Sequence, residues 1–385
     1  MAPTEIRMHN GVREIAVEAW DNLVGSDHPF TSHAFLAGLE EHDCIQSAFG
    51  WQSCPIGLYE DDTLVAAAPI YLKGNSHGEF VFDWSWAGAY QRNGLDYYPK
   101  LLCAVPYSPV TGPRLLVGGG DGSELRRRAL ISAIEHHVQS NGLSSAHLNF
   151  VDSSGAVAFS GTRWLPRMDW QFHWRNRGWS DFEEYLGALK PKKRKNIRQE
   201  RRSVLAAGVH CEIRHGEELD PGDWRAIHDL YLSTFEAHGN HPALTESFFR
   251  HLGRSMPRQI IAVLCRKAGM IIAASLCLRG GDTLYGRYWG THEQVAGLHF
   301  EACYYQGIEY CIEHKLQWFE PGAQGEHKIA RGFLPRATRS FHYIADPRFS
   351  QAISDALHRE TLALADYRQD LMQHSPFTAA DDAAA

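Results

Sequence analysis

Two stretches of the chain, 203 to 206 positions apart, show the same succession of apolar runs and turns. In the first half these are LVAAAPIYLK (64–73) and FVFDWSWAGAYQRNGLDYYPKL (80–101). Their counterparts in the second half are IIAASLCLRG (271–280) and TLYGRYWGTHEQVAGLHFEACY (283–304). A shift of 203 positions aligns Trp86 with Trp289, Gln91 with Gln294 and Gly94 with Gly297. Because self-similarity in a constant order marks repeated structural units, this pattern predicts an internal duplication.

Each copy is predicted to form three neighbouring strands followed by a helix. In the second copy the strands are QIIAVLCRK, MIIAASLCLR and DTLYGRYWG, and the helix covers roughly residues 299–314. In the first copy CPIGLYE, TLVAAAPIYLK and FVFDW take the strand positions. A strand at 209–214 and helices near 223–236 and 245–253 precede the second copy, and a strand at 316–319 follows it.

The length of 385 residues exceeds what one ordinary core accommodates, so two domains are expected. We predict an N-terminal domain over residues 1–180 and a C-terminal domain over residues 181–385. The second domain opens with a basic helix at 191–207, and a helix at 351–373 closes the chain.

The basic segment stands out because the whole chain has a net charge of -7. KPKKRKNIRQERR, from Lys190 to Arg202, contains eight basic residues and one acid. Pro191 suits the first turn of a helix and Gly208 the position after its end. A cationic helix in an acidic protein is expected to attract phosphate groups of a nucleotide, a nucleic acid or a lipid head group. Lys193, Arg194 and Arg198 are its candidate contacts.

Several function classes lack their motifs. The eight cysteines form no CxxC pair, and the 22 histidines show no HExxH spacing, so we expect no metal ion. No GxSxG elbow or GxxxxGK[ST] loop occurs, so the sequence argues against an α/β-hydrolase and against a P-loop kinase. No apolar run suits a membrane span and the N-terminus lacks a signal-peptide core, so a cytoplasmic location is expected.

Four segments resemble the bacterial Fem-like group of the GNAT (GCN5-related N-acyltransferase) superfold. They are HGEFVFDWSWAGAY (77–90), YYPKLLCAVPYSPVTGPRLL (97–116), LHFEACYYQGIEYCIE (298–313) and EPGAQGEHKIARGFLPRATRSFHYI (320–344). LKPKKRKNIRQERRSVLAAGV (189–209) is similar to the basic helix that opens the second domain of Fem-type aminoacyltransferases.

The resemblance implies an α/β (α+β) fold of two tandem, duplicated GNAT-like acyltransferase domains, each with a mixed, mostly antiparallel sheet flanked by helices. It implies transfer of an acyl or aminoacyl group to an amine acceptor, in a cleft between the domains, with aminoacyl-tRNA or acyl-CoA as donor. The alternatives are an acyl-CoA-dependent N-acetyltransferase and a non-catalytic protein that recognises peptidoglycan or nucleic acid.

The loop between the third strand and the helix bears on the donor. CoA-dependent members of the superfold have a glycine-rich loop there, whose backbone N–H groups bind pyrophosphate. Here the loop reads GTHEQVAGLHF, with only Gly290 and Gly297. This composition favours a donor other than CoA.

The segment after residue 319 is the richest in candidate catalytic and binding residues. Amine acylation needs a base to accept a proton and donors to stabilise an oxyanion. Candidate bases are Glu320, Glu326 and His327, and candidate binding residues are Gln324, Lys328, Arg331 and Arg336.

Further candidates lie in the two copies. Glu301 and Tyr305 are four residues apart and are expected on one helical face, next to Trp289. Glu301 and Tyr305 could act on a nucleophile or bond to each other. In the first copy, Asp83 is a candidate catalytic carboxylate because a buried acid needs a partner, and Arg114 is the expected partner. Trp86 and Tyr90 are candidate binding residues, although aromatic residues at strand spacing are also typical of a core.

Overall fold

The computed structural model describes residues 4–25, 27–239, 241–323 and 325–378. The chain divides into two compact units: unit 1 contains residues 1–169 and 337–365, and unit 2 contains residues 170–336 and 366–385. The chain passes from one unit to the other within strand β8 (Leu165–Arg175), strand β14 (Leu334–Ile344) and helix α12 (Pro347–Gln373). This division differs from a single cut after residue 180, because residues 337–365 return to unit 1.

Unit 1 contains two sheets. A three-stranded antiparallel sheet has the order β1-β3-β4, and the strands β2-β5-β6-β7-β14 form the second. Pro69 separates β4 from β5 and cannot donate a ladder hydrogen bond, so the chain changes sheets there. The strands are β1 (Thr4–Met8), β2 (Trp51–Ser53), β3 (Ile56–Glu60), β4 (Thr63–Ala68), β5 (Ile70–Lys73), β6 (Lys100–Cys103) and β7 (Ser145–Leu148).

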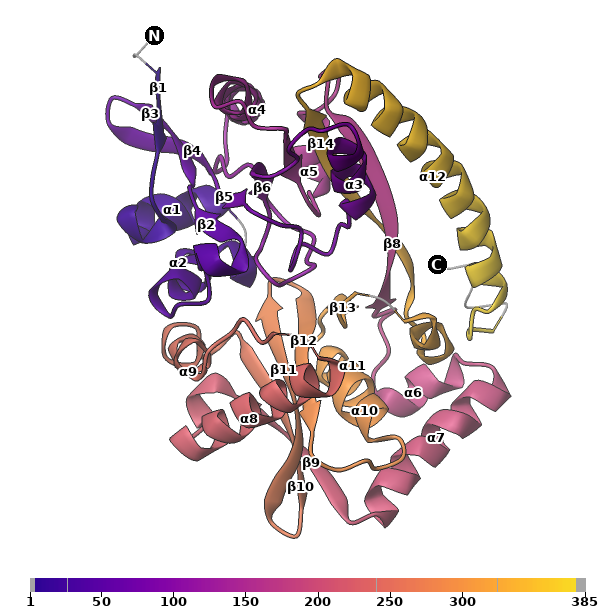
Figure 1. The fold of residues 1–385 in the computed structure, drawn as a ribbon. Helices are drawn as coiled ribbons and strands as arrows, with labels where there is room; N and C mark the ends of the chain where they lie inside the picture. The colour runs from indigo at the N-terminus through magenta and orange to yellow at the C-terminus, as the bar shows by residue number, and fades with distance from the viewer. Residues whose placement is uncertain (1–3, 26, 240, 324, 379–385) are drawn as a thin grey trace. The chain divides into compact units, whose positions relative to one another are not determined.

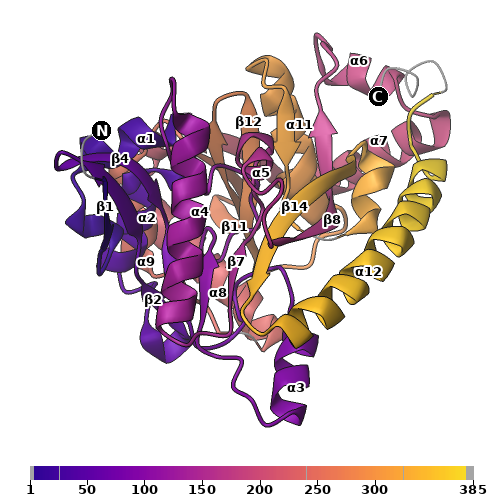
Figure 2. The same cartoon turned by 90° about the horizontal axis from the view of Figure 1, so that it is seen from above.

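Helices cover the unit 1 sheets. Helix α4 packs against β3, β4 and β7, and α1 packs against β4 (Figure 2). Apolar residues of α4, including Leu130 and Ile134, face the core of this unit. The helices are α1 (Val17–Val24), α2 (His33–Glu41), α3 (Trp84–Arg92), α4 (Ser123–Ser140) and α5 (Ser153–Val157).

The predicted strand at 80–84 is wrong. Phe80 has a φ of 61°, which an extended strand does not allow, and helix α3 begins at Trp84. The side chains of Phe80, Phe82 and Trp84 are exposed instead of packed into a sheet. The segment turns away because the carboxylates of Glu79 and Asp83 bond to the buried Lys100.

Unit 2 is built on the antiparallel strands β9 (Val209–His215), β10 (Ile260–Lys267), β11 (Met270–Gly280) and β12 (Thr283–Thr291), visible in Figure 1. Strand β13 (Trp318–Glu320) is parallel to β12 and antiparallel to the end of β8. The predicted strands of the second copy are therefore confirmed, and the predicted strand at 316–319 starts two residues later than expected.

The predicted helices of unit 2 are present. Helix α7 (Pro191–Ala206) has proline in its first turn and is followed by Gly208 with a φ of 75°, as predicted. Helix α8 (Pro221–His238) begins with a capping box at Asp220, and the Thr245 side chain caps α9 (Glu246–Ser255). A short helix, α6 (Phe182–Gly187), precedes α7.

The helix after β12 has an unusual centre. It starts as α10 (Leu298–Phe300), continues as a π-helix (Glu301–Tyr305) and ends as α11 (Gln306–Glu313). It packs against the sheet through Leu298, Ala302 and Ile308. Because π-helical turns are rare and occur often at functional sites, this stretch directs attention to its polar residues.

Comparison of the units corrects the alignment of the duplication. Unit 1 has an antiparallel pair β5–β6, the helix α4 and a strand β7 parallel to β6. Unit 2 has the pair β11–β12, the helix α10–α11 and a strand β13 parallel to β12. The shift of 203 is wrong because it places Trp86 on a helix opposite Trp289 on a strand.

The predicted fold class, α/β with mixed, mostly antiparallel sheets and flanking helices, is confirmed. Across the described chain, every helix is too short or too polar to traverse a lipid bilayer.

Candidate functional site

The segment that follows β13 contains several of the candidate catalytic and binding residues of unit 2. A loop leads from Glu320 to a short 3-10 helix, η6 (Glu326–Arg331). Gln324, a predicted binding residue, lies outside the described residues. Helix α7 packs against both η6 and the π-helix, so the predicted basic helix and the predicted catalytic segment lie together within one unit.

His327 is an exposed imidazole on η6. Its Nε2 lies 2.9 Å from the hydroxyl of Tyr304, which in turn lies 3.4 Å from Nε2 of His299. A side chain at position 325 would collide with the ring, so Gly325 allows the imidazole to lie over the backbone. Partial burial, and then the cations Lys328 and Arg331, lower the pKa of His327, so the ring is neutral at physiological pH.

Lys328 points inward. Its side chain is 2% exposed, and Nζ donates to the carbonyl oxygens of Gly322 and Ala323 at 2.8 and 3.1 Å. Burial, and next the charge of Arg287, lower the pKa of Lys328 to about 7. Lys328 therefore fixes the loop and places a partial positive charge beside His327.

Two ion-pair groups attach α7 to this segment. Arg331 donates to Glu200 at 2.7 Å and to the Tyr305 hydroxyl at 2.9 Å, and Tyr305 donates to Glu200. Arg201 binds Glu301 through two hydrogen bonds of 3.1 Å. Glu301 and Tyr305 therefore do not bond to each other, because each has its partner on α7.

The remaining acids of the segment also have partners. Glu320 is buried, with one oxygen 3.5 Å from Nη2 of Arg287 and the other 3.7 Å from Nδ1 of His173. Glu326 is exposed and accepts from the Tyr367 hydroxyl at 2.6 Å. Trp289 is half-buried on β12 and meets the ring of His299 edge-on. Among the predicted bases, His327 is the exposed group with a lowered pKa.

The basic helix presents an outer face. Lys192, Lys195, Arg198 and Arg202 are exposed, and Arg198 pairs with Glu183 at the surface. The predicted contacts Lys193 and Arg194 are half-buried. Ile197 and Val204 are buried on the inner face, as the predicted apolar side requires.

The predicted residues of unit 1 lie in a closed cluster. Asp83 is 2% exposed and accepts from Lys100, Ser76 and Tyr97. Arg114 is not its partner, because the Arg114 guanidinium donates to the carbonyl oxygens of Asn149, Val110 and Pro113. Trp86 packs edge-on against His342, and Tyr90 lies in the same aromatic core.

Sequence reasoning missed two members of this cluster. Lys73 lies over the ring of Trp51, and His147 shares a 2.7 Å hydrogen bond with His342. A signal was present: Lys73 and Lys100 each end or begin an apolar strand, and a cation in such a place needs a buried partner.

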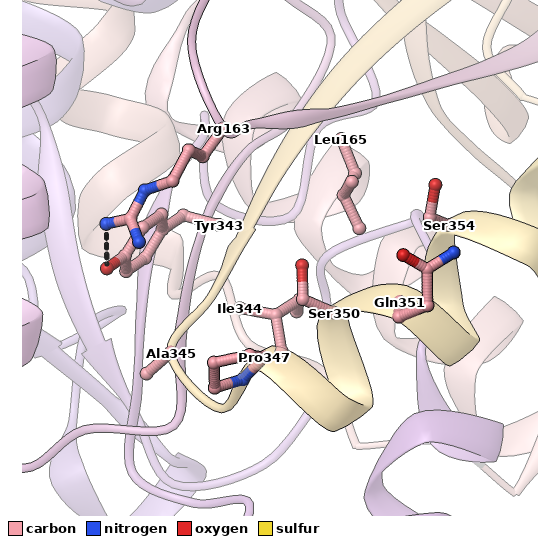
Figure 3. A pocket seen from close by; sticks show the side chains of 9 residues that line it. All are labelled: Arg163, Leu165, Tyr343, Ile344, Ala345, Pro347, Ser350, Gln351 and Ser354. Carbon is pink, nitrogen blue, oxygen red and sulfur yellow. Dashed lines mark hydrogen bonds between the residues drawn. The ribbon is translucent and has the colours of Figure 1, made fainter.

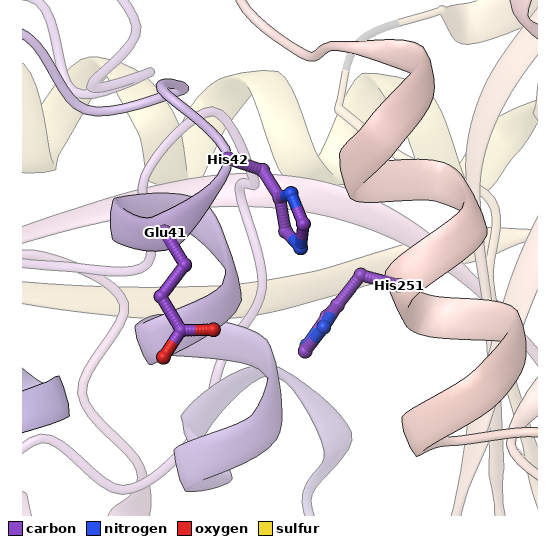
Figure 4. Close-up of side chains that lie close together, drawn as sticks. All are labelled: Glu41, His42 and His251. Carbon is purple, nitrogen blue, oxygen red and sulfur yellow. The ribbon is translucent and has the colours of Figure 1, made fainter.

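Two other features of the structure contribute no catalytic group. A cavity of about 200 Å³ in unit 1 is lined by Arg163, Tyr343 and the first turn of α12 (Figure 3). Figure 4 draws Glu41 and His42 from unit 1 and His251 from unit 2. Because these three residues belong to different units, no metal site is assigned to them.

Comparison with known proteins shows which family the chain belongs to. The FemAB_like family, described as peptidoglycan biosynthesis/recognition, matches residues 11–379. The structure is similar to that of FemX, with 12% identity and a TM-score of 0.52 over 91% of this chain and 100% of that one. It is also similar to the C-terminal domain (DUF2156) of a protein assigned as a lysylphosphatidylglycerol synthetase from Agrobacterium fabrum, with 10% identity and a TM-score of 0.52 over 88% and 95%.

A tandem GNAT protein from the clavulanic acid biosynthesis pathway aligns at 12% identity and a TM-score of 0.47, over 90% of this chain and 99% of that one. No curated protein matches the sequence significantly. Identities this low concern the fold alone, whereas the family match extends over nearly the whole chain. The chain therefore belongs to the FemAB-like family, as its resemblance predicted.

Proposed function

We propose that this chain is an N-acyltransferase that moves an acyl or aminoacyl group to an amine, with His327 of unit 2 as the base. One observation carries the proposal: an exposed, neutral imidazole lies on a segment to which a cationic helix is attached. The first feature suits proton removal from an amine, and the second suits a phosphate-bearing donor.

The hydrogen bonds around His327 define its role. For Nδ1 to accept a proton, Nε2 must carry its own hydrogen and donate it to the oxygen of Tyr304. Tyr304 can then donate to His299, which completes a chain of three side chains. Burial raises the pKa of Tyr304, so its hydroxyl keeps its proton at neutral pH. This chain orients the imidazole and disperses the charge that it gains.

In the proposed reaction the amine nitrogen attacks the carbonyl carbon of the donor and the ester or thioester bond breaks. His327 accepts the proton lost by the amine and returns it to the leaving oxygen or sulfur. Formation of the C–N bond and loss of the C–O or C–S bond balance without a redox partner.

An aminoacyl-tRNA is the preferred donor. Both glycines of the loop after β12 serve backbone packing: a side chain at Gly290 would meet the Leu230 carbonyl at 1.9 Å, and one at Gly297 the Glu200 carbonyl at 3.0 Å. They are thus explained without a pyrophosphate ligand. The outer face of α7 supplies the cations that RNA would require. Such a donor agrees with the predicted cytoplasmic location, and the predicted cleft between domains stays a prediction.

The test is a transfer assay with a mixture of labelled aminoacyl-tRNAs, or with acetyl-CoA, and a panel of amines. We expect His327→Gln to lower kcat by about 10²–10⁴-fold with an unchanged melting temperature, as loss of a general base does. His358→Gln, an exposed histidine of unit 1, is the matched control. In the wild type, kcat/KM should decline on the acid side with an apparent pKa below 6.5.

Three results would contradict the proposal or part of it. Binding of RNA or peptidoglycan fragments without turnover over the whole panel would favour the recognition protein. If His327→Gln leaves turnover intact, the base is a residue other than His327. If transfer from acetyl-CoA is faster than transfer from aminoacyl-tRNA, the donor is acyl-CoA.

A further inference from the structure

Unit 2 contains a second feature that acyl transfer does not use. A cavity of about 430 Å³ lies at the end of β8, the start of β13 and β14 and the last turns of α12. Its polar lining consists of four arginines, Arg175, Arg177, Arg336 and Arg368, together with His173 and Trp318. We call this cavity the arginine pocket.

The strands explain why these cations meet. Arg175 is paired with Trp318 in the β8–β13 ladder, and His173 lies two residues before Arg175 on the same face of β8. Arg336 is the third residue of β14. The sheet therefore brings together cations from segments that are far apart in the sequence.

An aromatic ring lies beside each of the four guanidinium groups. Arg336 lies 4.0 Å and Arg175 5.6 Å from the centroid of the Trp318 ring. Arg177 lies 3.9 Å from the centroid of Phe377, and Arg368 lies 5.6 Å from that of Trp170. Stacking of this kind restricts long side chains before any ligand arrives. A ligand then orders fewer groups on binding, so its affinity is higher.

Three of the four arginines have no acidic partner among the described residues. The lining contains no carboxylate, and within the described chain Arg175, Arg336 and Arg368 form no ion pair. This contrasts with Arg201 and Arg331 of the same unit, each of which binds a glutamate. Arg175, Arg336 and Arg368 are exposed, so solvent screens part of their mutual repulsion, and an anion bound between them would remove the rest.

His173 adds a buried polar group to the wall of the pocket. The imidazole is 4% exposed, its Nε2 lies 3.3 Å from the side-chain oxygen of Gln171, and its Nδ1 lies 3.7 Å from a carboxylate oxygen of Glu320. Both ring nitrogens therefore face groups of unit 2, so the arginines are the groups available to a ligand.

We propose that the arginine pocket binds a compact polyphosphate group, either of a nucleoside diphosphate or of free inorganic polyphosphate. Guanidinium forks match phosphate oxygens two at a time. A diphosphate concentrates several negative charges on adjacent groups, whereas RNA carries one per nucleotide. The volume of the pocket is in the range of small-molecule sites. This proposal does not depend on the transferase activity.

Calorimetry with inorganic pyrophosphate, ADP and a short unstructured RNA tests the proposal in the full chain at physiological ionic strength. The pocket variant combines Arg175→Gln, Arg336→Gln and Arg368→Gln. Its control combines Arg225→Gln, Arg254→Gln and Arg258→Gln, which removes the same charge from exposed positions of unit 2. We expect the pocket variant to weaken diphosphate binding by about 100-fold or more, since each charge-assisted contact contributes about tenfold. The control should bind as the wild type does.

Stability gives a second readout. Without ligand the pocket variant should melt at or above the wild-type temperature, because charge repulsion is relieved. Pyrophosphate should raise the melting temperature of the wild type and the control only. Should the triple variant fail to fold, Arg336→Gln alone, at an exposed position, replaces it.

The outcomes are separable. Tighter binding of ADP than of pyrophosphate assigns the ligand to nucleotides, and equal binding assigns it to free polyphosphate. Three results would each overturn the proposal. The first is equal weakening of diphosphate binding in both triple variants, and the second is that neither pyrophosphate nor ADP binds. The third is RNA binding that depends on the pocket when neither diphosphate binds. Because the assay contains no acyl donor and no amine, its failure is distinct from failure of the proposed function.

Discussion

Units 1 and 2 share a succession of strands and a helix, which we call the frame, and differ in whether their charged side chains are buried or exposed. In both, an antiparallel strand pair is followed by a helix and by a strand parallel to the second member of the pair. In unit 1 the ionisable groups beside this frame are sealed: Lys100 is 0% exposed, and Glu79, Asp83 and His147 are buried with it. In unit 2, His327 and the outer face of α7 are open to solvent.

The two clusters also differ in balance. In unit 1 the cations Lys73 and Lys100 face the acids Glu79 and Asp83, so the group is neutral and closed. In unit 2 the acids neutralise the inner cations, and additional cations remain at the surface and in the arginine pocket. The two units thus arrange their charged residues differently on a similar succession of elements, which is why we propose that the chemistry takes place in unit 2.

The largest expected effect concerns the sealed cluster. Lys100→Met leaves the buried Asp83 without its cation and Glu79 with only Lys73, 3.9 Å away, and should lower the free energy of unfolding by about 3–5 kcal/mol. Urea denaturation measures the loss, and Lys195→Met, on the exposed face of α7, should change it by less than about 0.5 kcal/mol. A loss below about 1 kcal/mol for Lys100→Met would remove the distinction between a sealed and an open unit.

An intermediate effect concerns the open surface of unit 2. Combining Lys192→Gln, Lys195→Gln and Arg202→Gln should weaken RNA binding and flatten its dependence on salt. The slope of log affinity against log salt should fall in magnitude by about 2, since each lost single-strand contact contributes about 0.7. The control removes Arg13, Arg92 and Arg359, three exposed cations of unit 1, in the same way. An equal change in affinity and salt slope in both variants would mean that RNA has no preference for the exposed cations of unit 2 over those of unit 1.

The smallest effect concerns the pH dependence of unit 1. Burial raises the pKa of Glu79 to about 7, so the folded chain keeps a proton that the unfolded chain releases near its ordinary value. Unfolding free energy should therefore fall as pH rises from about 4.5 to 7, and Glu79→Gln should reduce this fall by about 1–2 kcal/mol. Urea midpoints at three pH values measure it, with Glu18→Gln as the exposed control. An unchanged pH profile would show that Glu79 remains ionised.

Much of unit 2 was predictable because its strands are long and its turns carry glycine. The strands β10 to β12 and the helices α7 to α9 follow from apolar periodicity and capping residues that act over a few positions. Unit 1 was less predictable, since FVFDW has the composition of a strand yet turns away to carry Glu79 and Asp83 to Lys100. That interaction spans about twenty residues and leaves no local pattern.

The site was predictable in part for the same reason. The density of ionisable residues after position 319 indicates His327 and Arg331 from the sequence alone, and Glu301 and Tyr305 of the π-helix are also among the predicted residues. The preference for His327 as the proposed base was not predictable, because it depends on the exposure of the imidazole and on Lys328 beside it. The arginine pocket was invisible except for Arg336, since its four cations come from β8, the segment after it, β14 and α12.

The path of the chain has a consequence for dividing the molecule into fragments. Strand β7 of unit 1 pairs with β14, which follows most of unit 2 in the sequence, and β13 of unit 2 pairs with β8, which precedes most of that unit. Neither half of the sequence therefore contains a complete unit, and a fragment made from either half would have a bare sheet edge. Such fragments are expected to aggregate instead of folding as separate domains.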